Sequence, residues 1–276
     1  MYHSGRSHLS QWILGLVRRN NVMRTITTLC LTVVCSAAVS VAGLLAIRAV
    51  VPPAYALSSN EICGAYMQTI GTIYAVLLAF VVFVVWTQAN DVRRLIERQA
   101  DELADVLRIT GAFNGSAASN VLGAARAYAR EVADNEWPLL ATGRSSPKAQ
   151  ELLEQTWLAL TAIEPATARE EVLFSEAVSR FSEFGDARAD LLHSGRIRLP
   201  ILLWLLLLSG AAGTIGSMYI FGAEQFWPVA AMTASLAGAV SFMLFLIRDL
   251  DNPFQGDWQV SPALILAAAG PTDVHE

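Results

Sequence analysis

Residues Ile62–Thr110 read ICGAYMQTIGTIYAVLLAFVVFVVWTQANDVRRLIERQADELADVLRIT, and this stretch decides the fold. Its first 29 residues, Ile62–Asn90, carry no charge, and about 20 apolar residues are enough to cross a hydrocarbon core. From Asp91 onward, apolar residues recur with a helical period while charged residues fill the other face. Neither proline nor glycine occurs between residues 72 and 110. The stretch therefore predicts one long helix that leaves the bilayer and continues into water.

The composition also indicates a membrane protein. The 276 residues are 54% hydrophobic and 16% charged, with a mean hydropathy of +0.44, which is too apolar for an ordinary soluble domain. The net charge of −5 comes from interleaved acids and bases, so we expect no nucleic-acid partner. The lipid bilayer is the partner that the composition predicts.

Three further uncharged stretches predict spans in addition to residues 62–90. They are Thr25–Ile47, Leu199–Ala223 and Gln225–Ile247. The sequence thus predicts an all-α membrane protein with transmembrane helices in residues 25–90 and 199–247. A cleavable signal peptide ending at Ala54-Tyr55-Ala56 is the alternative for the first stretch, although its apolar run is longer than such signals use.

The basic residues predict the orientation. Four arginines lie in residues 1–24, Arg48 alone lies between the first two spans, and 13 basic residues lie in residues 91–198. Because positive residues stay on the cytoplasmic side, we expect a multi-pass protein of the inner (plasma) membrane with both termini cytoplasmic. Residues 1–24 then form a basic cytoplasmic segment, and residues 248–276 form a cytoplasmic tail.

Residues 91–198 predict a cytoplasmic helical bundle formed by extensions of spans 2 and 3. The first helix runs to about Thr110. A second is capped by Ser119 or Asn120 and stopped by Pro138. A third starts at Ser146-Pro147, and a fourth has Thr167 and Glu170 as a capping box. The predicted inward-facing residues are Val121, Ala125, Tyr128, Val132, Leu153, Trp157, Leu160, Ile163, Leu173, Ala177, Phe181, Phe184 and Leu191.

Small residues recur every four positions on the last two spans. We interpret them as helix-packing seams, because small side chains let backbones approach closely in lipid. They are Ser209, Gly213 and Ser217 on the third span and Ala230, Ala234 and Gly238 on the fourth. The cysteines Cys30, Cys35 and Cys63 are interpreted as small core residues.

The sequence contains no recognisable catalytic motif. His193 with Asp190 and Ser194 could be drawn as a catalytic trio, but neighbours on one helix end rarely have that geometry, so we expect a solvated histidine. The sequence has no phosphate-binding glycine loop and no metal-ligand spacing. We therefore predict neither an enzyme nor a bound cofactor or metal. The predicted spans also contain no charged residue, which argues against a proton-coupled transporter.

The C-terminal run Asp251-Asn252-Pro253-Phe254-Gln255-Gly256-Asp257 carries a family resemblance. An Asn-Pro-Phe-x-Gly-Asp run after the last span resembles the bestrophin anion channels, and the chain from about Thr25 to Ala269 resembles the bacterial bestrophin-like domain family, whose function is not established. Further matching features are Trp86, Glu136-Trp137-Pro138, Leu192-His193-Ser194, Pro200 and Trp204.

In bestrophins this run continues into an acidic stretch that binds calcium, and the second span lines the pore of a homopentamer. The resemblance implies the same two features for this chain. This sequence departs from the first point, since it offers only Asp249, Asp251 and Asp257 where calcium takes 6–8 oxygens. We therefore expect a structural role: Pro253 ends the helix, Phe254 and Trp258 dock at the interface or on the bundle, and residues 263–269 form a short helix.

Two functions of different classes remain open. In the first, a homo-oligomer conducts ions, and one mixed small and polar face of span 2 surrounds the axis. The candidate pore-lining residues are Gln68, Thr72, Ala75, Ala79, Val82 and Trp86, with Asn90 on the same line. The alternative for this face is a seam packed within the subunit. In the second function, the protein is a non-conducting scaffold or signalling protein that presents the bundle to a partner.

Overall fold

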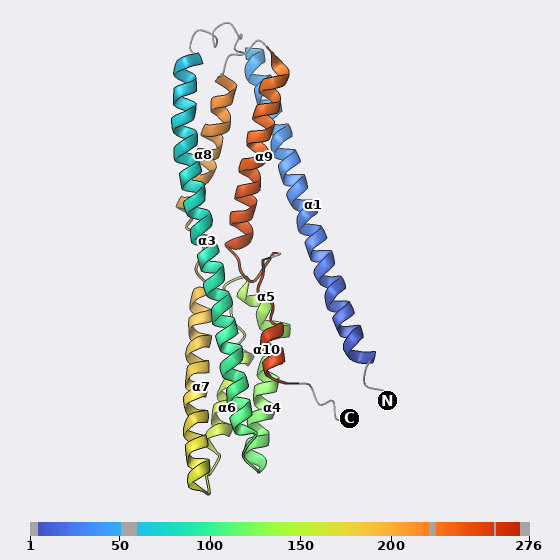
Figure 1. The fold of residues 1–276 in the computed structure, drawn as a ribbon, viewed down its shortest axis with the longest axis vertical. Helices are drawn as coiled ribbons and strands as arrows, with labels where there is room; N and C mark the ends of the chain where they lie inside the picture. Colours follow the sequence, from blue (N-terminus) through green and yellow to red (C-terminus); the bar gives the residue numbers. More distant parts are fainter. Residues whose placement is uncertain (1–4, 51–59, 221–224, 257, 271–276) are drawn as a thin grey trace. The chain divides into compact units, whose positions relative to one another are not determined.

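The computed structural model describes residues 5–50, 60–220, 225–256 and 258–270, and for residues 5–22, 24 and 60–63 it describes the backbone alone. All regular structure in these ranges is helical (Figure 1). The chain divides into two compact units, residues 1–86 with 199–251 and residues 87–198 with 252–276. We call them the apolar unit and the polar unit. Ala54-Tyr55-Ala56 and Asp257 lie outside the described residues.

The apolar unit contains the four predicted spans. They are α1 (Gly5–Val50), the first part of α3 (Asn60–Thr110), α8 (Ile201–Ile220) and α9 (Phe226–Leu250). All four helices are long and apolar enough to cross a membrane, which confirms that prediction at the level of length and composition. One difference concerns the basic N-terminal segment, because α1 begins at Gly5 and is continuous with the first span.

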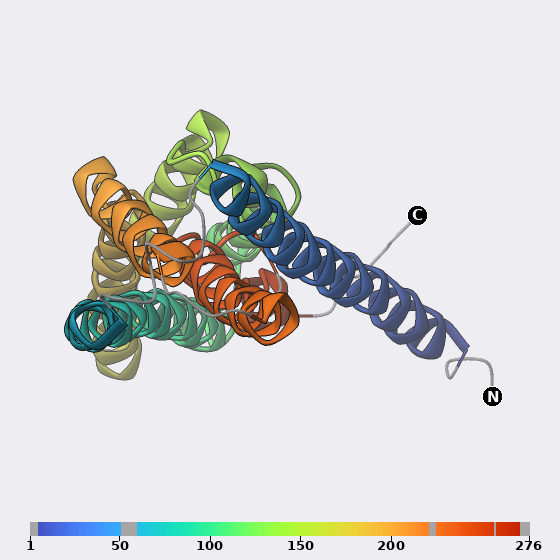
Figure 2. The same cartoon turned by 90° about the horizontal axis from the view of Figure 1, so that it is seen from above.

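The strongest packing in the apolar unit is between α1 and α9, which lie side by side (Figures 1 and 2). Ala230 and Gly238 of α9 are buried, and a Cβ atom on Gly238 would lie 3.3 Å from Cγ1 of Val33. The Ser36 hydroxyl donates to the Ala237 carbonyl across the same contact, at 3.4 Å. The small-residue seam predicted on the fourth span is therefore confirmed, and it faces the first span.

The seam predicted on the third span is wrong in its register. Ser217 is buried, but Ser209 and Gly213 are exposed, and a Cβ atom on Gly213 would meet nothing within 4 Å. The close approach is at Gly210, where a Cβ atom would lie 2.5 Å from Cδ2 of Tyr74 on α3. The register differs because the bulky Tyr74 ring fits only opposite a glycine. The face of α8 that contains Gly210 therefore packs against α3, and the face that contains Gly213 does not.

The interpretation of the cysteines as core residues is also wrong where the structure tests it. Cys30 and Cys35 are exposed on α1. The side chain of Cys63 lies outside the described part of the chain.

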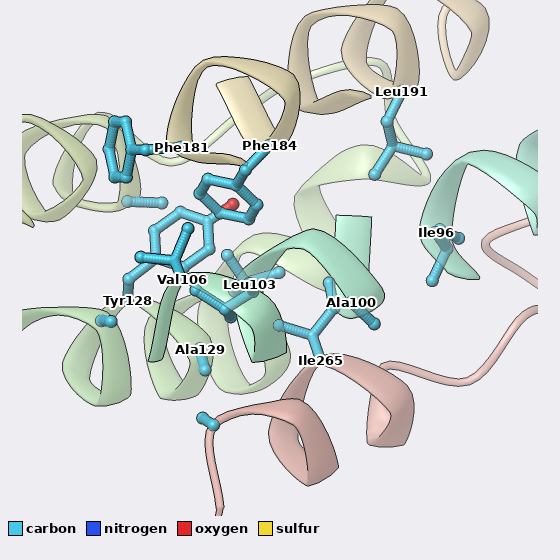
Figure 3. Close-up of a cluster of buried hydrophobic side chains, with 14 of the residues drawn as sticks. Ile96, Ala100, Leu103, Val106, Tyr128, Ala129, Phe181, Phe184, Leu191 and Ile265 are labelled. Atoms are coloured by element: carbon cyan, nitrogen blue, oxygen red, sulfur yellow. The ribbon is translucent and has the colours of Figure 1, made fainter. Parts of the chain in front are cut away.

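The polar unit is a helical bundle. It contains the rest of α3, α4 (Ser116–Glu131), the π-helical turn η1 (Val132–Glu136), α5 (Trp137–Leu140), α6 (Pro147–Thr161), α7 (Ala168–Ser194) and α10 (Ala263–Ala268). Figure 3 shows side chains from α3, α4, α7 and α10 pointing toward one another in its core. The largest fully buried apolar side chains of this core are Tyr128, Phe184, Ile96, Leu103, Leu160, Leu191 and Ile265.

Two of the three predicted side-chain caps are present, whereas the cap predicted at Ser119 or Asn120 is wrong, because α4 begins at Ser116 without a side-chain cap. Ser146 Oγ accepts from the Ala149 amide at 3.3 Å and begins α6. Thr167 Oγ1 accepts from the Glu170 amide at 3.2 Å, while the Glu170 carboxylate accepts from the Ala166 amide at 2.7 Å. This reciprocal pair satisfies amides at the start of α7 that have no partner within the helix.

Other predictions about the bundle need correction. The second helix begins at Ser116 after Gly115, and Pro138 does not stop it, because the chain continues through η1 into α5. A proline lacks the amide hydrogen that an α-helix needs at that position, and the wider π-helical turn directly before Pro138 accommodates that loss. Trp157, predicted to face in, is 36% exposed. The prediction that span 3 continues as a helix into the bundle is also wrong. The helix α7 ends at Ser194 and α8 begins only at Ile201, so residues 195–200 interrupt the helix between them.

The pair Gly210 and Gly213 gives a matched test of the apolar unit. We expect Gly210→Ala to lower the stability of the detergent-solubilised protein by about 1–3 kcal/mol, because the new methyl group overlaps the buried Tyr74 ring. Gly213→Ala should leave stability unchanged or raise it by up to about 1 kcal/mol, because alanine favours the helix and meets open space. Thermal denaturation monitored by tryptophan fluorescence measures both. Equal midpoints for the two variants would contradict this packing.

Candidate functional site

The candidate pore-lining residues of α3 lie on a face that its own unit does not cover. Tyr74, Val81 and Val85 are buried and define the packed face of this helix. Gln68, Thr72, Ala75, Ala79 and Trp86 are exposed and Val82 is half-buried. At 100° per residue, this line is centred about 120° from the packed face. The alternative that the line is a seam packed within the subunit is therefore wrong for its five exposed members.

The exposed part of α3 contains two stripes of different chemistry. One is the small and polar line of Gln68, Thr72, Ala75 and Ala79, on which the Thr72 hydroxyl donates to the Gln68 carbonyl at 2.7 Å. Next to it is a stripe of large apolar side chains, each at least 64% exposed: Ile73, Val76, Phe80 and Phe83. Large apolar side chains suit lipid or a second protein surface, whereas small and polar ones let a helix border water.

The C-terminal run is held by hydrogen bonds within each of the two units. In the apolar unit, Asp251 forms the C-cap of α9, and its Oδ1 accepts from the Leu199 amide at 2.8 Å. In the polar unit, Asn252 Oδ1 accepts from Arg198 Nη2 at 3.1 Å and from the Phe254 amide at 3.4 Å. Asn252 Nδ2 donates to the Ala141 carbonyl at 3.0 Å and to Gln255 Oε1 at 3.4 Å. Every hydrogen-bonding position of the Asn252 amide is used in this way.

The rest of the run docks the chain on the bundle. Phe254 is 3% exposed and packs edge-on against Trp137 at 5.4 Å between ring centroids. Gly195 leaves the room for this ring, since a Cβ atom there would lie 2.8 Å from Cε2 of Phe254. Gly256 has φ of 84°, a conformation that favours glycine. The predicted docking of Phe254 is confirmed, whereas Trp258 is 46% exposed.

The polar unit contains a buried ion pair that was not predicted from the sequence. Arg188 on α7 and Glu136 at the end of η1 are 3% and 1% exposed, and two parallel bonds of 2.9 Å join the guanidinium to the carboxylate. Arg188 Nη1 also donates to the Tyr128 hydroxyl at 2.7 Å, and Gln99 Nε2 of α3 donates to the same hydroxyl at 2.8 Å. A single buried network thus joins α3, α4, η1 and α7.

Ser146, at the start of α6, extends this network to a second carboxylate, that of Glu131. The Ser146 amide donates to Glu136 Oε1 at 2.9 Å. Glu131 accepts from the Ser146 hydroxyl and from Asn135 Nδ2, both at 2.7 Å. These hydrogen bonds from Ser146 and Asn135 hold the pKa of Glu131 below its ordinary value, so this carboxylate is ionised at neutral pH. Burial raises the pKa of Tyr128 far above its ordinary value, so this phenol keeps its proton.

One signal in the sequence could have revealed Arg188. It stands four residues after Phe184 and three before Leu191, on the stripe that was predicted to face in. A charged residue at a buried helical position requires a buried counter-charge. Glu136 belonged to the Glu136-Trp137-Pro138 feature of the family resemblance, but nothing in that feature indicated its burial or its partner, because its position depends on the π-helical turn. His193 is exposed, which confirms the interpretation of a solvated histidine.

A model of the bestrophin-like domain matches residues 34–265. The chain belongs to the bestrophin-like domain family. The fold is similar to that of a bacterial bestrophin homologue from Klebsiella pneumoniae carrying a mutation, with a TM-score of 0.58, 13% identity and coverage of 89% of this chain and 98% of that one. A crystal structure of a membrane protein gives a TM-score of 0.57 at 12% identity, over 90% and 99% of the two chains. The comparison with curated proteins gave no match.

The Arg188–Glu136 pair gives a test of the bundle of this bestrophin-like protein. We expect Arg188→Met or Glu136→Gln to lower the free energy of unfolding by about 3–5 kcal/mol, because each leaves a buried charge without its partner. The double variant should be more stable than the sum of the two losses predicts, since both charges are gone and the amide oxygen introduced by Glu136→Gln can still accept from the Ser146 amide. Chemical denaturation in detergent, followed by circular dichroism, measures all three.

Arg94 provides the control for this test. It pairs with Asp91 at 3.5 Å, and both side chains are more than half exposed. Removing such a surface pair costs about 1 kcal/mol or less, so Arg94→Met should be nearly neutral. Equal losses of stability for Arg94→Met and Arg188→Met would contradict a special contribution from the buried network.

Proposed function

We propose that this bestrophin-like protein is a subunit of a homo-oligomeric ion channel in which α3 lines the pore. The observation that carries the proposal is the exposed line of small and polar residues on an otherwise apolar helix. Gln68, Thr72, Ala75 and Ala79 are left uncovered by α8 and α9 while Tyr74 and Val81 are buried. A single α3 helix cannot enclose a water-filled path, so several copies are needed.

The chemistry of the two exposed stripes supports the same arrangement. If the small and polar line faces the axis, the stripe of Ile73, Val76 and Phe80 turns toward lipid or the adjacent copy, where large apolar side chains are stable. The predicted spans hold no charged residue that could serve as a proton relay or a catalytic acid. Passive movement of ions therefore suits these residues better than coupled transport or catalysis.

The proposed orientation follows from the basic residues. With 13 lysines and arginines in residues 91–198 and Arg48 alone between the first two spans, we place both termini and the polar unit in the cytoplasm. The protein is then a multi-pass protein of the bacterial inner membrane, with lipid, ions and further copies of itself as its partners.

Ala79 gives the most direct functional test. Between Thr72 and Trp86 the line offers only alanine and valine, so the narrowest part of the pore should be dry and gate by dewetting. Replacing Ala79 with Ser or Asn should wet this constriction and raise ion flux through reconstituted liposomes several-fold. Val84 is also exposed but lies about 140° away on the helical wheel, so Val84→Ser should change flux little.

The outcome separates the two functional classes. If neither the wild type nor the two Ala79 variants pass more ions than empty liposomes do, the channel function is contradicted. The scaffold or signalling function, with the polar unit presented to a partner, would then take its place. Flux that rises equally in the Ala79 and Val84 variants would contradict the assigned face of α3.

The orientation has its own test in a cysteine-free background. A cysteine at position 59, between the first two spans, should react with an impermeant maleimide on intact cells. Ser179→Cys, on the exposed surface of α7, should react only after permeabilisation. Ser146 is unsuitable for this purpose because its side chain is buried. Labelling in the reverse order would contradict the proposed topology.

A further inference from the structure

The polar part of α3 separates its charged residues into paired and unpaired ones. Nine charged residues lie between Asp91 and Arg108. Six of them form ion pairs: Asp91 with Arg94, Arg98 with Glu183, Glu102 with Arg180, and Asp105 with Arg108, at 3.1–3.9 Å. The other three are Arg93, Glu97 and Asp101, which are exposed and have no ion pair within the described part of the chain.

These three residues share one face of the helix. In the polar unit, the buried face of α3 is marked by Val92, Ile96 and Leu103. Measured from Trp86, the positions of Arg93, Glu97 and Asp101 are about −20°, 20° and 60°. The three unpaired charges therefore continue the helical register of the proposed pore line.

We propose that Arg93, Glu97 and Asp101 line the cytoplasmic mouth of the channel and that the two carboxylates make it prefer cations. This inference rests on the proposed function, because it needs several copies of α3 around an axis. In a ring of copies, each of the three residues becomes a ring of like charges, spaced about 6 Å apart along the helix at 1.5 Å per residue. Two acidic rings and one basic ring give the mouth a net negative charge.

The lack of ion pairs is what gives these charges an effect on ions. A carboxylate paired with an arginine, such as Glu102 with Arg180, has its field largely cancelled within the subunit. Arg93 and Glu97 are four residues apart, a spacing at which side chains on a helix can meet, yet no ion pair joins them. Charges of one sign lining a confined, low-dielectric mouth raise the local concentration of the opposite ion.

The test is the reversal potential of the reconstituted protein under a KCl gradient. Wild type should favour K⁺ over Cl⁻, and the double variant Glu97→Gln with Asp101→Asn should lower the cation-to-anion permeability ratio by about tenfold. Arg93→Gln should raise the ratio. Glu154→Gln provides the control, because Glu154 is an exposed acid on α6, away from this line, and its loss should leave the ratio unchanged.

The outcomes keep this inference separate from the channel itself. Absence of flux in wild type contradicts the proposed function, and with it this inference. Conduction with a ratio that the double variant and Arg93→Gln leave unchanged overturns the inference alone. Loss of assembly in the double variant, seen by size-exclusion chromatography, also overturns it, because the carboxylates would then lie at contacts between copies and not at the mouth.

Discussion

One constraint governs this structure: α3 is one uninterrupted helix that must bury a face in two different environments. In the apolar unit it packs against α8 through Tyr74 and the notch at Gly210. In the polar unit it packs into the core through Val92, Ile96, Leu103 and Gln99. The helix has neither proline nor glycine from residue 72 to residue 110, so neither of these residues kinks it. The side of α3 that the apolar unit leaves uncovered is the side to which we assign the pore.

The bundle holds its part of α3 with a buried polar network in addition to apolar packing. The Arg188 guanidinium is the centre of this network, since it joins Glu136 by two bonds and Tyr128 by one. A buried ion pair adds little net stability compared with apolar residues, but it excludes packings in which either charge lacks its partner. The π-helical turn places Glu136 at this position, and Ser146 then ties the start of α6 to both Glu136 and Glu131. The network thus fixes one arrangement of the helices around Tyr128.

The sequence predicted what depends on local patterns, and it failed where distant side chains decide. The four spans, the caps at Ser146 and Thr167 and the docking of Phe254 follow from runs of apolar residues, hydrogen-bonding caps and one aromatic residue after a helix end. The register of the third span required knowledge that Tyr74 would lie against Gly210 and leave Gly213 uncovered. The continuation of the helix past Pro138 depends on the π-helical turn η1, which no local sequence pattern predicts. For the candidate pore, periodicity placed six residues on one line, but only the packed unit distinguishes an outward face from an internal seam.

The central claim is that copies of α3 surround an axis with the line from Gln68 to Trp86 facing inward. A cryo-EM reconstruction of the purified protein in lipid nanodiscs tests it most directly. We expect a closed ring in which α3 of every copy lies nearest the axis, with Ala75 and Ala79 at the narrowest part. A monomeric particle, or a ring in which α1 or α9 lies at the axis and the Ala79 face of α3 meets lipid, would contradict this claim.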